Sequence, residues 1–119
     1  MDARIVTRGR VKSVTSPCLE PCPIERGMRV LGGKWTGSIL WHVAREPIRF
    51  NDLARSIPAA SKKMIAERLR HLEDEGLLTR HVLETSPVAV EYRVTSRGRE
   101  AVAALDALRE WAGGNVQAR

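Results

Sequence analysis

Apolar residues follow two different spacings along the chain. From about residue 23 to residue 76 they recur three and four positions apart, which places them on one face of an α-helix. The clearest stripe consists of Ile65, Leu69 and Leu72. Over the segment 88–94 the spacing changes to two, because apolar and other residues alternate, as in a β-strand. The pattern predicts a series of helices, a β-hairpin and a final helix.

Prolines, glycines and short polar residues mark the expected boundaries of these elements. Pro23 suits the first turn of a helix, Ser61 is a good N-cap, and Gly76 suits the left-handed residue that ends a helix. Asn51 is expected to cap a short helix, which Pro58 separates from the next one. The predicted elements are helices over 23–31, about 35–45, 52–56 and 61–75, strands over 78–83 and 88–94, and a helix that starts at residue 95 or 96 and includes Ala112.

Two consecutive helices in this order form a candidate helix-turn-helix. The helices over 52–56 and 61–75 are joined by a turn of about four residues. A hairpin follows them directly, and a three-helix core followed by a hairpin is the winged-helix arrangement. We therefore predict a mainly α fold with a small β-hairpin (α+β) for residues 17–113, between a basic N-terminal tail (1–16) and a C-terminal tail (114–119).

Length and composition narrow the class of protein. The chain has 119 residues, of which 43% are hydrophobic, so it is long enough for one modest core and too apolar for wholesale disorder. No apolar run reaches the ~18 residues that a membrane-spanning helix needs, and the N-terminal segment lacks the apolar stretch of a signal peptide. Two cysteines fit a reducing compartment. We expect a soluble, cytoplasmic protein with no membrane partner.

The positive charge is confined to two segments. The net charge is +6; four Arg or Lys and one acid lie in residues 1–16, and six Arg or Lys and two acids lie in residues 49–70. A clustered basic segment is the usual electrostatic footprint of a nucleic-acid site. The alternative interpretation is a solvated surface with surplus arginine.

The charges of the helix over 61–75 are opposite to those that stabilise a helix. Lys62 and Lys63 lie in its first turn and three acids, residues 73–75, lie in its last turn, and each such charge costs a few tenths of a kcal/mol, up to ~1. In a helix-turn-helix the second helix enters the DNA major groove with its N-terminal residues against the bases, so the same order suits DNA binding. Candidate DNA-binding residues here are Arg49, Ser61, Lys62, Lys63 and Arg70. Arg49 and Arg55 could instead pair with neighbouring acids, and Arg68 could brace the helix.

Three stretches together resemble the HxlR-type winged-helix transcriptional regulators. They are CPIERGMRVLGGKWTGSILWHV, RFNDLARSIPAASKKMIAERLRHLEDEGLLTR and VEYRVTSRGRE, and the likeness covers residues 22–112. The resemblance implies a homodimeric bacterial regulator that binds a double-stranded DNA operator, with its recognition helix from Ser61 to about Glu75 and its wing over residues 78–94. It also implies that an oxidant or electrophile is sensed in some members, through the cysteine of the Cys-Pro motif, which is Cys22 here.

The chain departs from the family pattern at three positions. The family usually has Thr or Ser and then Gln where this chain has Ala66 and Glu67, which adds both to the DNA-binding candidates. Ala66 can offer a methyl contact to thymine, and Glu67 can accept a hydrogen bond from cytosine. The operator is therefore expected to differ from the family's commonest one. Ala89 replaces a basic residue at the wing tip, which weakens the case for a wing contact, and the basic tail could supply the missing charge.

The first and last helices carry the candidate dimer interface. The residues are Ile24, Met28, Leu31, Ala101, Leu105, Leu108 and Ala112. Burying these two stripes against a second copy would give an isologous two-fold dimer. The alternative is that the stripe of the last helix packs on the core of its own chain.

Cys22 and Cys18 are the candidate redox-sensing residues. Cys22 lies just before Pro23, so its sulfur is expected near a helix N-terminus, where the dipole and Arg26 favour the thiolate. Cys18 could resolve an oxidised Cys22 locally or join Cys22 of a second subunit. The alternative is that Cys22 is a small buried apolar residue.

Catalytic and metal sites are not expected. His42, His71 and His81 are scattered, and the two cysteines have no second pair to complete a zinc site. We expect no cofactor, no metal and no enzymatic activity. The leading hypothesis is a sequence-specific, homodimeric DNA-binding transcriptional regulator. The alternatives are a non-specific, architectural nucleic-acid-binding protein without a sensing role, and a protein-interaction module.

Overall fold

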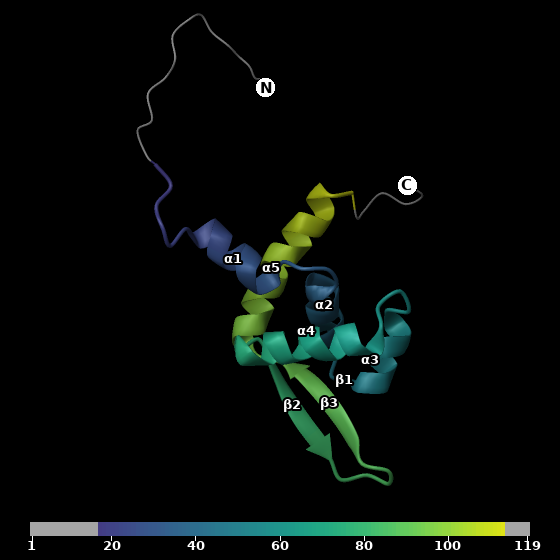
Figure 1. The fold of residues 1–119 in the computed structure, drawn as a ribbon. Helices are drawn as coiled ribbons and strands as arrows, with labels where there is room; N and C mark the ends of the chain where they lie inside the picture. The colour runs from purple at the N-terminus through teal and green to yellow at the C-terminus, as the bar shows by residue number, and fades with distance from the viewer. Residues whose placement is uncertain (1–16, 114–119) are drawn as a thin grey trace, which may run out of the picture.

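The fold consists of five helices and three short strands (Figure 1). The structure, a computed structural model, describes residues 17–113; the predicted tails over 1–16 and 114–119 lie outside the described residues. The elements are α1 (Pro23–Leu31), α2 (Thr36–Arg45), β1 (Ile48–Arg49), α3 (Phe50–Ser56), α4 (Lys62–Asp74), β2 (Leu78–Leu83), β3 (Ala89–Val94) and α5 (Ser96–Trp111). The predicted mainly α fold with a small hairpin is confirmed.

The core lies where α2, α3, α4 and the base of the hairpin meet. The stripe Ile65, Leu69 and Leu72 of α4 is buried there, as the spacing predicts. The other buried residues of this core are Ile39, Leu40, Val43, Leu53, Ile57, Ala60, Leu77, Leu78 and Tyr92. In Figure 1 the hairpin projects from one side of this core, and α1 and the C-terminal half of α5 lie on the opposite side. The core therefore fixes α4 and leaves its outer face free.

Capping residues define the ends of α4 and α5 as expected. Ser61 Oγ accepts a hydrogen bond from the backbone N–H of Met64 at 3.0 Å. Gly76 follows α4 with φ +80°, a left-handed conformation that favours glycine. The hydroxyl of Thr95 caps α5 by accepting from the N–H of Gly98 at 3.0 Å, and it donates to the carbonyl oxygen of Gly76 at 2.7 Å. One side chain therefore joins the end of α4 to the start of α5.

The sheet has one strand more than the sequence predicts. Its order is β1-β3-β2, all antiparallel, with Ile48 opposite Tyr92 and Leu78 opposite Val94. Pairing with β3 keeps Arg49 extended, so α3 begins at once, at Phe50, with Arg49 as its N-cap. The prediction that Asn51 caps this helix is therefore wrong.

Between residues 17 and 113, no helix is both long and apolar enough to cross a bilayer.

Candidate nucleic-acid interface

The outer face of α4 carries the predicted DNA-binding residues of this helix. All six are exposed: Ser61, Lys62, Lys63, Ala66, Glu67 and Arg70. They lie opposite the buried stripe, so the helix has one face in the core and one face in solvent. Lys62 and Lys63 are its first two residues, directly after the Ser61 cap, and the first turn contains no acid. The N-terminal end of α4 is therefore a cationic, accessible surface.

Arg49 and Arg55 lie in different surroundings on the neighbouring helix. Arg49 is exposed at the junction of β1 and α3. Arg55 forms an ion pair with Asp52 one turn earlier, which is the alternative that the sequence left open for it. Arg49 therefore stays a candidate for a phosphate contact, and Arg55 is engaged within α3.

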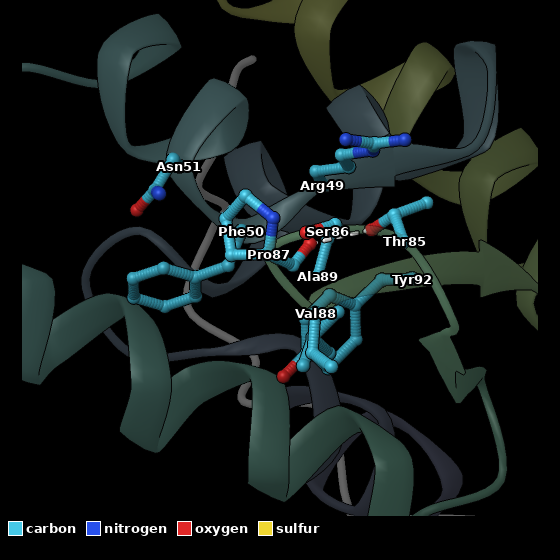
Figure 2. Close-up of a pocket in the computed structure, with 10 residues that line it drawn as sticks. Arg49, Phe50, Asn51, Thr85, Ser86, Pro87, Val88, Ala89 and Tyr92 are labelled. Carbon is cyan, nitrogen blue, oxygen red and sulfur yellow. Dashed lines mark hydrogen bonds between the residues drawn. The ribbon is translucent and has the colours of Figure 1, made fainter.

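A groove separates the start of α3 from the tip of the hairpin (Figure 2). Its volume is about 540 Å³, and its polar lining residues include Arg49, Asn51, Thr85 and Ser86. The tip is held by the hydroxyl of Thr85, which donates to the carbonyl oxygen of Pro87 at 2.6 Å. The sequence predicted Arg49 as a binding residue but not its polar neighbours in this groove, because only the short β1 strand brings Arg49 beside a hairpin tip more than thirty positions away.

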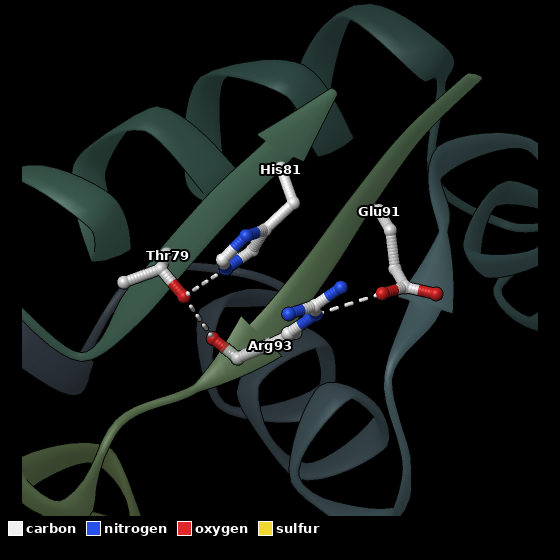
Figure 3. Close-up of polar contacts among 4 residues, drawn as sticks. All are labelled: Thr79, His81, Glu91 and Arg93. Carbon is white, nitrogen blue, oxygen red and sulfur yellow. Dashed lines mark hydrogen bonds and ion pairs between the residues drawn. The ribbon is translucent and has the colours of Figure 1, made fainter. Parts of the chain in front are cut away.

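The solvent face of the hairpin carries a polar cluster (Figure 3). Arg93 Nε donates to Glu91 Oε1 at 2.8 Å, and Thr79 Oγ1 lies 2.8 Å from His81 Nε2. Arg93 and Arg80 are both exposed, so the hairpin bears cations despite the neutral Ala89 near its tip. The alternation of the two strands could have identified Arg93 as a second source of wing charge.

The inner side of α4 is attached to α1 and to the turn that follows it. The Nε2–H of His71 donates to the carbonyl oxygen of Val30, in the last turn of α1, at 2.8 Å. Arg68 Nε donates to the carbonyl oxygen of Lys34 at 3.0 Å. Arg68 therefore braces the helix, as the sequence suggested. His71 was missed, because the residue it contacts is 41 positions away.

Cys22 is the N-cap of α1, at the position that the sequence predicts. It is only 6% exposed, whereas Cys18 is exposed, and both are free thiols. The pKa of Cys22 is lowered by the backbone N–H of Glu25, by the Cys18 thiol, by the backbone N–H of Ile24 and by the charge of Arg26, although no N–H makes a capping bond of ordinary geometry. The pKa of Cys18 is raised, because its thiol donates to Cys22. Cys22 is therefore the more acidic of the two thiols.

The candidate dimer residues fall into two groups. Ile24, Met28 and Leu108 are large apolar side chains that are 72%, 57% and 53% exposed, and Ala112 is exposed as well. Three others pack against the core of their own chain, namely Leu31, Ala101 and Leu105. Trp111, one turn beyond Leu108, is 84% exposed and was missed in the sequence. The exposed members of this candidate set, together with Trp111, therefore lie on α1 and on the outer part of α5.

Within residues 17–113, no three His, Cys, Asp or Glu side chains come together in a way that could hold a metal ion.

These features define a class of protein. Helices α3 and α4 form a helix-turn-helix, α2 completes a three-helix core, and the β2–β3 hairpin follows as a wing. The fold is a winged helix-turn-helix. Solved structures with this fold include the reduced form of the transcriptional regulator YodB from B. subtilis, with 35% identity, a TM-score of 0.69 and coverage of 81% of this chain and 95% of that one. The redox regulator HypR in its oxidised form is 34% identical, with a TM-score of 0.74 and coverage of 81% and 99%.

Sequence comparison gives the family. The family described as HxlR-like helix-turn-helix matches residues 30–119. YybR, an uncharacterised HTH-type transcriptional regulator of Bacillus subtilis (strain 168), is 35% identical over 99 residues, which are 83% of this chain and 79% of YybR. YodB, an HTH-type transcriptional regulator of the same strain, is 37% identical over 92 residues, which are 76% and 82% of the two chains. The chain belongs to the HxlR-like helix-turn-helix family and is a transcriptional regulator of the HTH type.

Proposed function

We propose that the protein is a homodimeric, sequence-specific DNA-binding regulator that responds to oxidants or electrophiles through Cys22. The cationic, accessible N-terminal end of α4 carries this proposal. Lys62 and Lys63 point two charges away from the helix N-terminus, where they weaken the helix and would be offset by DNA phosphates. Ala66, Glu67 and Arg70 follow on the same face and would meet base edges. The regulator has no enzymatic role in this proposal.

The groove beside the wing supports a second contact with DNA. When α4 lies in the major groove, the wing of such a fold lies along the flanking backbone. Arg49 and Asn51 on one side of the groove, with Ser86 on the other, offer hydrogen-bond donors to phosphate oxygens. Arg80 adds charge on the hairpin, whereas the charge of Arg93 is offset by Glu91. These contacts would position the protein, and the face of α4 would select the sequence.

Exposed apolar side chains support the homodimer. Ile24, Met28, Leu108 and Trp111 present large apolar groups to solvent on α1 and α5. An extensive apolar surface of this kind on a small domain usually marks an interaction site. A two-fold contact through these helices would place two copies of α4 at two half-sites about one or more turns of DNA apart, roughly 34 Å or a multiple of it.

The paired thiols support the sensing role. A peroxide would oxidise the Cys22 thiolate to a sulfenic acid, with one oxygen transferred and the peroxide reduced to water or an alcohol. Attack by a second thiol would then expel water and form a disulfide. Cys18 of the same chain, four residues upstream, is one candidate partner, and Cys18 of a second copy is the other. YodB is known as a diamide-treated structure and HypR as an oxidised one, which fits this chemistry.

The contacts of α1 with α4 suggest how the signal would reach DNA. Cys22 begins α1, and the last turn of α1 accepts a hydrogen bond from His71 of α4. A disulfide at Cys22 would move the start of α1, and the rigid helix would carry that movement to its other end. Two recognition helices would then lose their common spacing without any change in the residues that contact DNA.

One experiment tests DNA binding, specificity and sensing together. Fluorescence anisotropy is measured with DNA flanking the protein's own gene and with a scrambled duplex, before and after diamide and then after a reductant. We expect an affinity at least ~10³-fold higher for the operator, with a reversible change on oxidation. Equal affinity for both duplexes would favour the non-specific nucleic-acid binder, and no affinity for either at low salt would favour the protein-interaction module.

A further inference from the structure

We propose that Glu67 is a specificity-determining residue: its carboxylate accepts a hydrogen bond from the amino group of a cytosine in the operator and disfavours any other base at that position. The residue lies on the exposed face of α4, the helix proposed to enter the major groove. The inference rests on the proposed function and adds to it the base pair, C·G, that this face requires.

Glu67 lies on the outermost line of α4. Because an α-helix turns by about 100° per residue, Lys63, Glu67 and Arg70 follow one another along the side opposite the buried stripe. All three side chains are exposed, and Glu67 is the only acid from Lys62 to Leu72. In a helix that lies in the major groove, this line reaches deepest toward the bases, and the residues on either side of it face the sugar-phosphate backbones. Glu67 is therefore placed to meet a base edge.

The carboxylate of Glu67 is available to a partner on DNA. Among the described residues, neither Lys63 nor Arg70 forms an ion pair with it, although each lies one turn away. An exposed, unpaired carboxylate is hydrated, and it loses this water when the helix enters the groove. It then needs a hydrogen-bond donor from DNA, because a charge that is buried without a partner is costly.

Only two of the four bases present a donor in the major groove. Guanine presents acceptors and thymine presents an acceptor and a methyl group, whereas adenine and cytosine each present an amino group. The amino group of adenine lies beside the acceptor N7, so the second carboxylate oxygen would face a like partial charge. Cytosine presents its amino group with no acceptor on the same base. Cytosine is therefore the base that suits Glu67.

The same carboxylate would limit binding to other sequences. Lys62 and Lys63 attract any DNA through its phosphates, and this attraction carries no sequence information. A carboxylate between these lysines and Arg70 makes the attraction conditional, because a wrong base leaves it without a donor. One wrong base pair at a contacted position typically lowers affinity by roughly 5- to 150-fold. Glu67 therefore contributes to selectivity largely by rejecting wrong sequences.

The test is in vitro selection by the full chain from a duplex library whose random segment is about two helical turns long. We expect the parent to enrich a C·G pair at one position of the half-site. Glu67→Gln should enrich A·T there instead, because a glutamine amide is bidentate to N6 and N7 of adenine. On two duplexes that differ only at this pair, the parent should favour C·G at least about five-fold in fluorescence anisotropy, and Glu67→Gln should reverse the order.

Asp74→Asn is the matched control. It removes the same charge from the same exposed line, but at the last residue of α4, away from the N-terminal end that enters the groove. It should keep the base preferences of the parent. Glu67→Gln should also bind a scrambled duplex more tightly than either the parent or Asp74→Asn. Circular dichroism checks that both variants are folded, as expected for exposed side chains.

Three results would overturn this inference alone. The first is a Glu67→Gln selection with the same base as the parent at every position. The second is a position that changes in Glu67→Gln but holds a base pair other than C·G in the parent. The third is an equal change of preference in Asp74→Asn, because the effect would then come from net charge. A parent that enriches no sequence would overturn the proposed sequence-specific function as well, so the two failures are distinguishable.

Discussion

The imidazole of His71 in α4 and the carbonyl oxygen of Val30 in α1 are joined by a hydrogen bond of 2.8 Å. The same α4 exposes Lys62 and Lys63 on its other side. The helix therefore holds the candidate DNA contacts on one face and an attachment to the cysteine-bearing helix on the other. Affinity for DNA and response to oxidation should then be separable by mutation.

Removing the His71 donor should uncouple the two properties. We expect His71→Leu to bind the operator in reducing buffer within about three-fold of the parent, because the lost hydrogen bond contributes only ~1 kcal/mol. Its change in affinity after diamide should be less than half that of the parent. His71→Gln, which keeps a donor at this distance, should restore the response. Anisotropy measurements on the three proteins decide this, and a full response from His71→Leu would show that the contact transmits nothing.

Neutralising the start of α4 should weaken DNA binding in a salt-dependent way. Lys62→Ala and Lys63→Ala should each reduce the log–log slope of affinity against salt by about one unit if each lysine contacts one phosphate. Arg55→Ala is the control, because Arg55 is paired with Asp52 and should leave the slope unchanged. The measurement is operator affinity between low and moderate salt. Unchanged slopes in both lysine variants would remove α4 from the DNA interface.

The two thiols should differ in their reaction with alkylating agents. Because the pKa of Cys22 is lowered from an ordinary value of 9.0 and that of Cys18 is raised, the thiolate of Cys22 should form at lower pH. Alkylation of the parent chain by iodoacetamide, with each cysteine followed separately by peptide mass spectrometry, should therefore reach its half-maximal rate at a lower pH for Cys22 than for Cys18. The lowered pKa of Cys22 also stabilises the folded chain. This stabilisation is fully present above the pKa of the thiol in the unfolded chain, and it is lost as pH falls through the pKa of the thiol in the folded chain. Identical profiles would leave Cys22 without the thiolate character that sensing needs.

Charge on the exposed apolar surface should separate the proposed dimer. Met28→Asp and Leu108→Asp should each give monomers in sedimentation, because each would bury a charge in the dimer interface. The monomers should stay folded, because both side chains are exposed within their own chain. Leu105→Ala is the contrasting variant. Because the Leu105 side chain packs on the core of its own chain, its removal should mainly lower the free energy of unfolding, by ~2 kcal/mol or more. Dimers that persist in both aspartate variants would place the interface elsewhere.

The features that could be predicted from the sequence are those set by the spacing of apolar residues within one helix or strand. Ile65, Leu69 and Leu72 could be assigned to the core because a helix places them on one side, and the opposite face followed from them. Arg68 and His71 differ, because their acceptors, the carbonyl oxygens of Lys34 and Val30 respectively, come within reach only when α1 and the turn after it pack beside α4. The sequence suggested only a bracing role for Arg68 and nothing for His71.

Periodicity also cannot distinguish an apolar stripe that packs on its own chain from one that is left for a second copy. Leu105 and Leu108 belong to the same apolar stripe of α5, but Leu105 meets its own core and Leu108 reaches past it. The strand β1 was missed for another reason, since two residues are too few for any alternation. It exists only because β3 supplies its hydrogen-bonding partner.

Gly98 should tolerate no side chain. A Cβ at this position would overlap the carbonyl oxygen of Leu77 and the side chain of Val94. Gly98→Ala should therefore lower the free energy of unfolding by about 1–3 kcal/mol, measured by urea denaturation. Gly27→Ala, on an open face of α1, is the control and should be neutral or stabilising. Equal stability of the two variants would mean that α5 can shift away from the hairpin.

The hairpin leaves and rejoins the domain at almost one point. The N–H of Thr95 donates to the carbonyl oxygen of Leu77 at 3.0 Å, and its hydroxyl donates to that of Gly76 at 2.7 Å. Insertions or deletions at the tip of the hairpin, near Ser86, would therefore change the length of the wing. They would leave the contacts between the end of α4 and the start of α5 unchanged. Loop length at that tip is therefore free to diverge during evolution, because such a change leaves the packing of the domain around it intact.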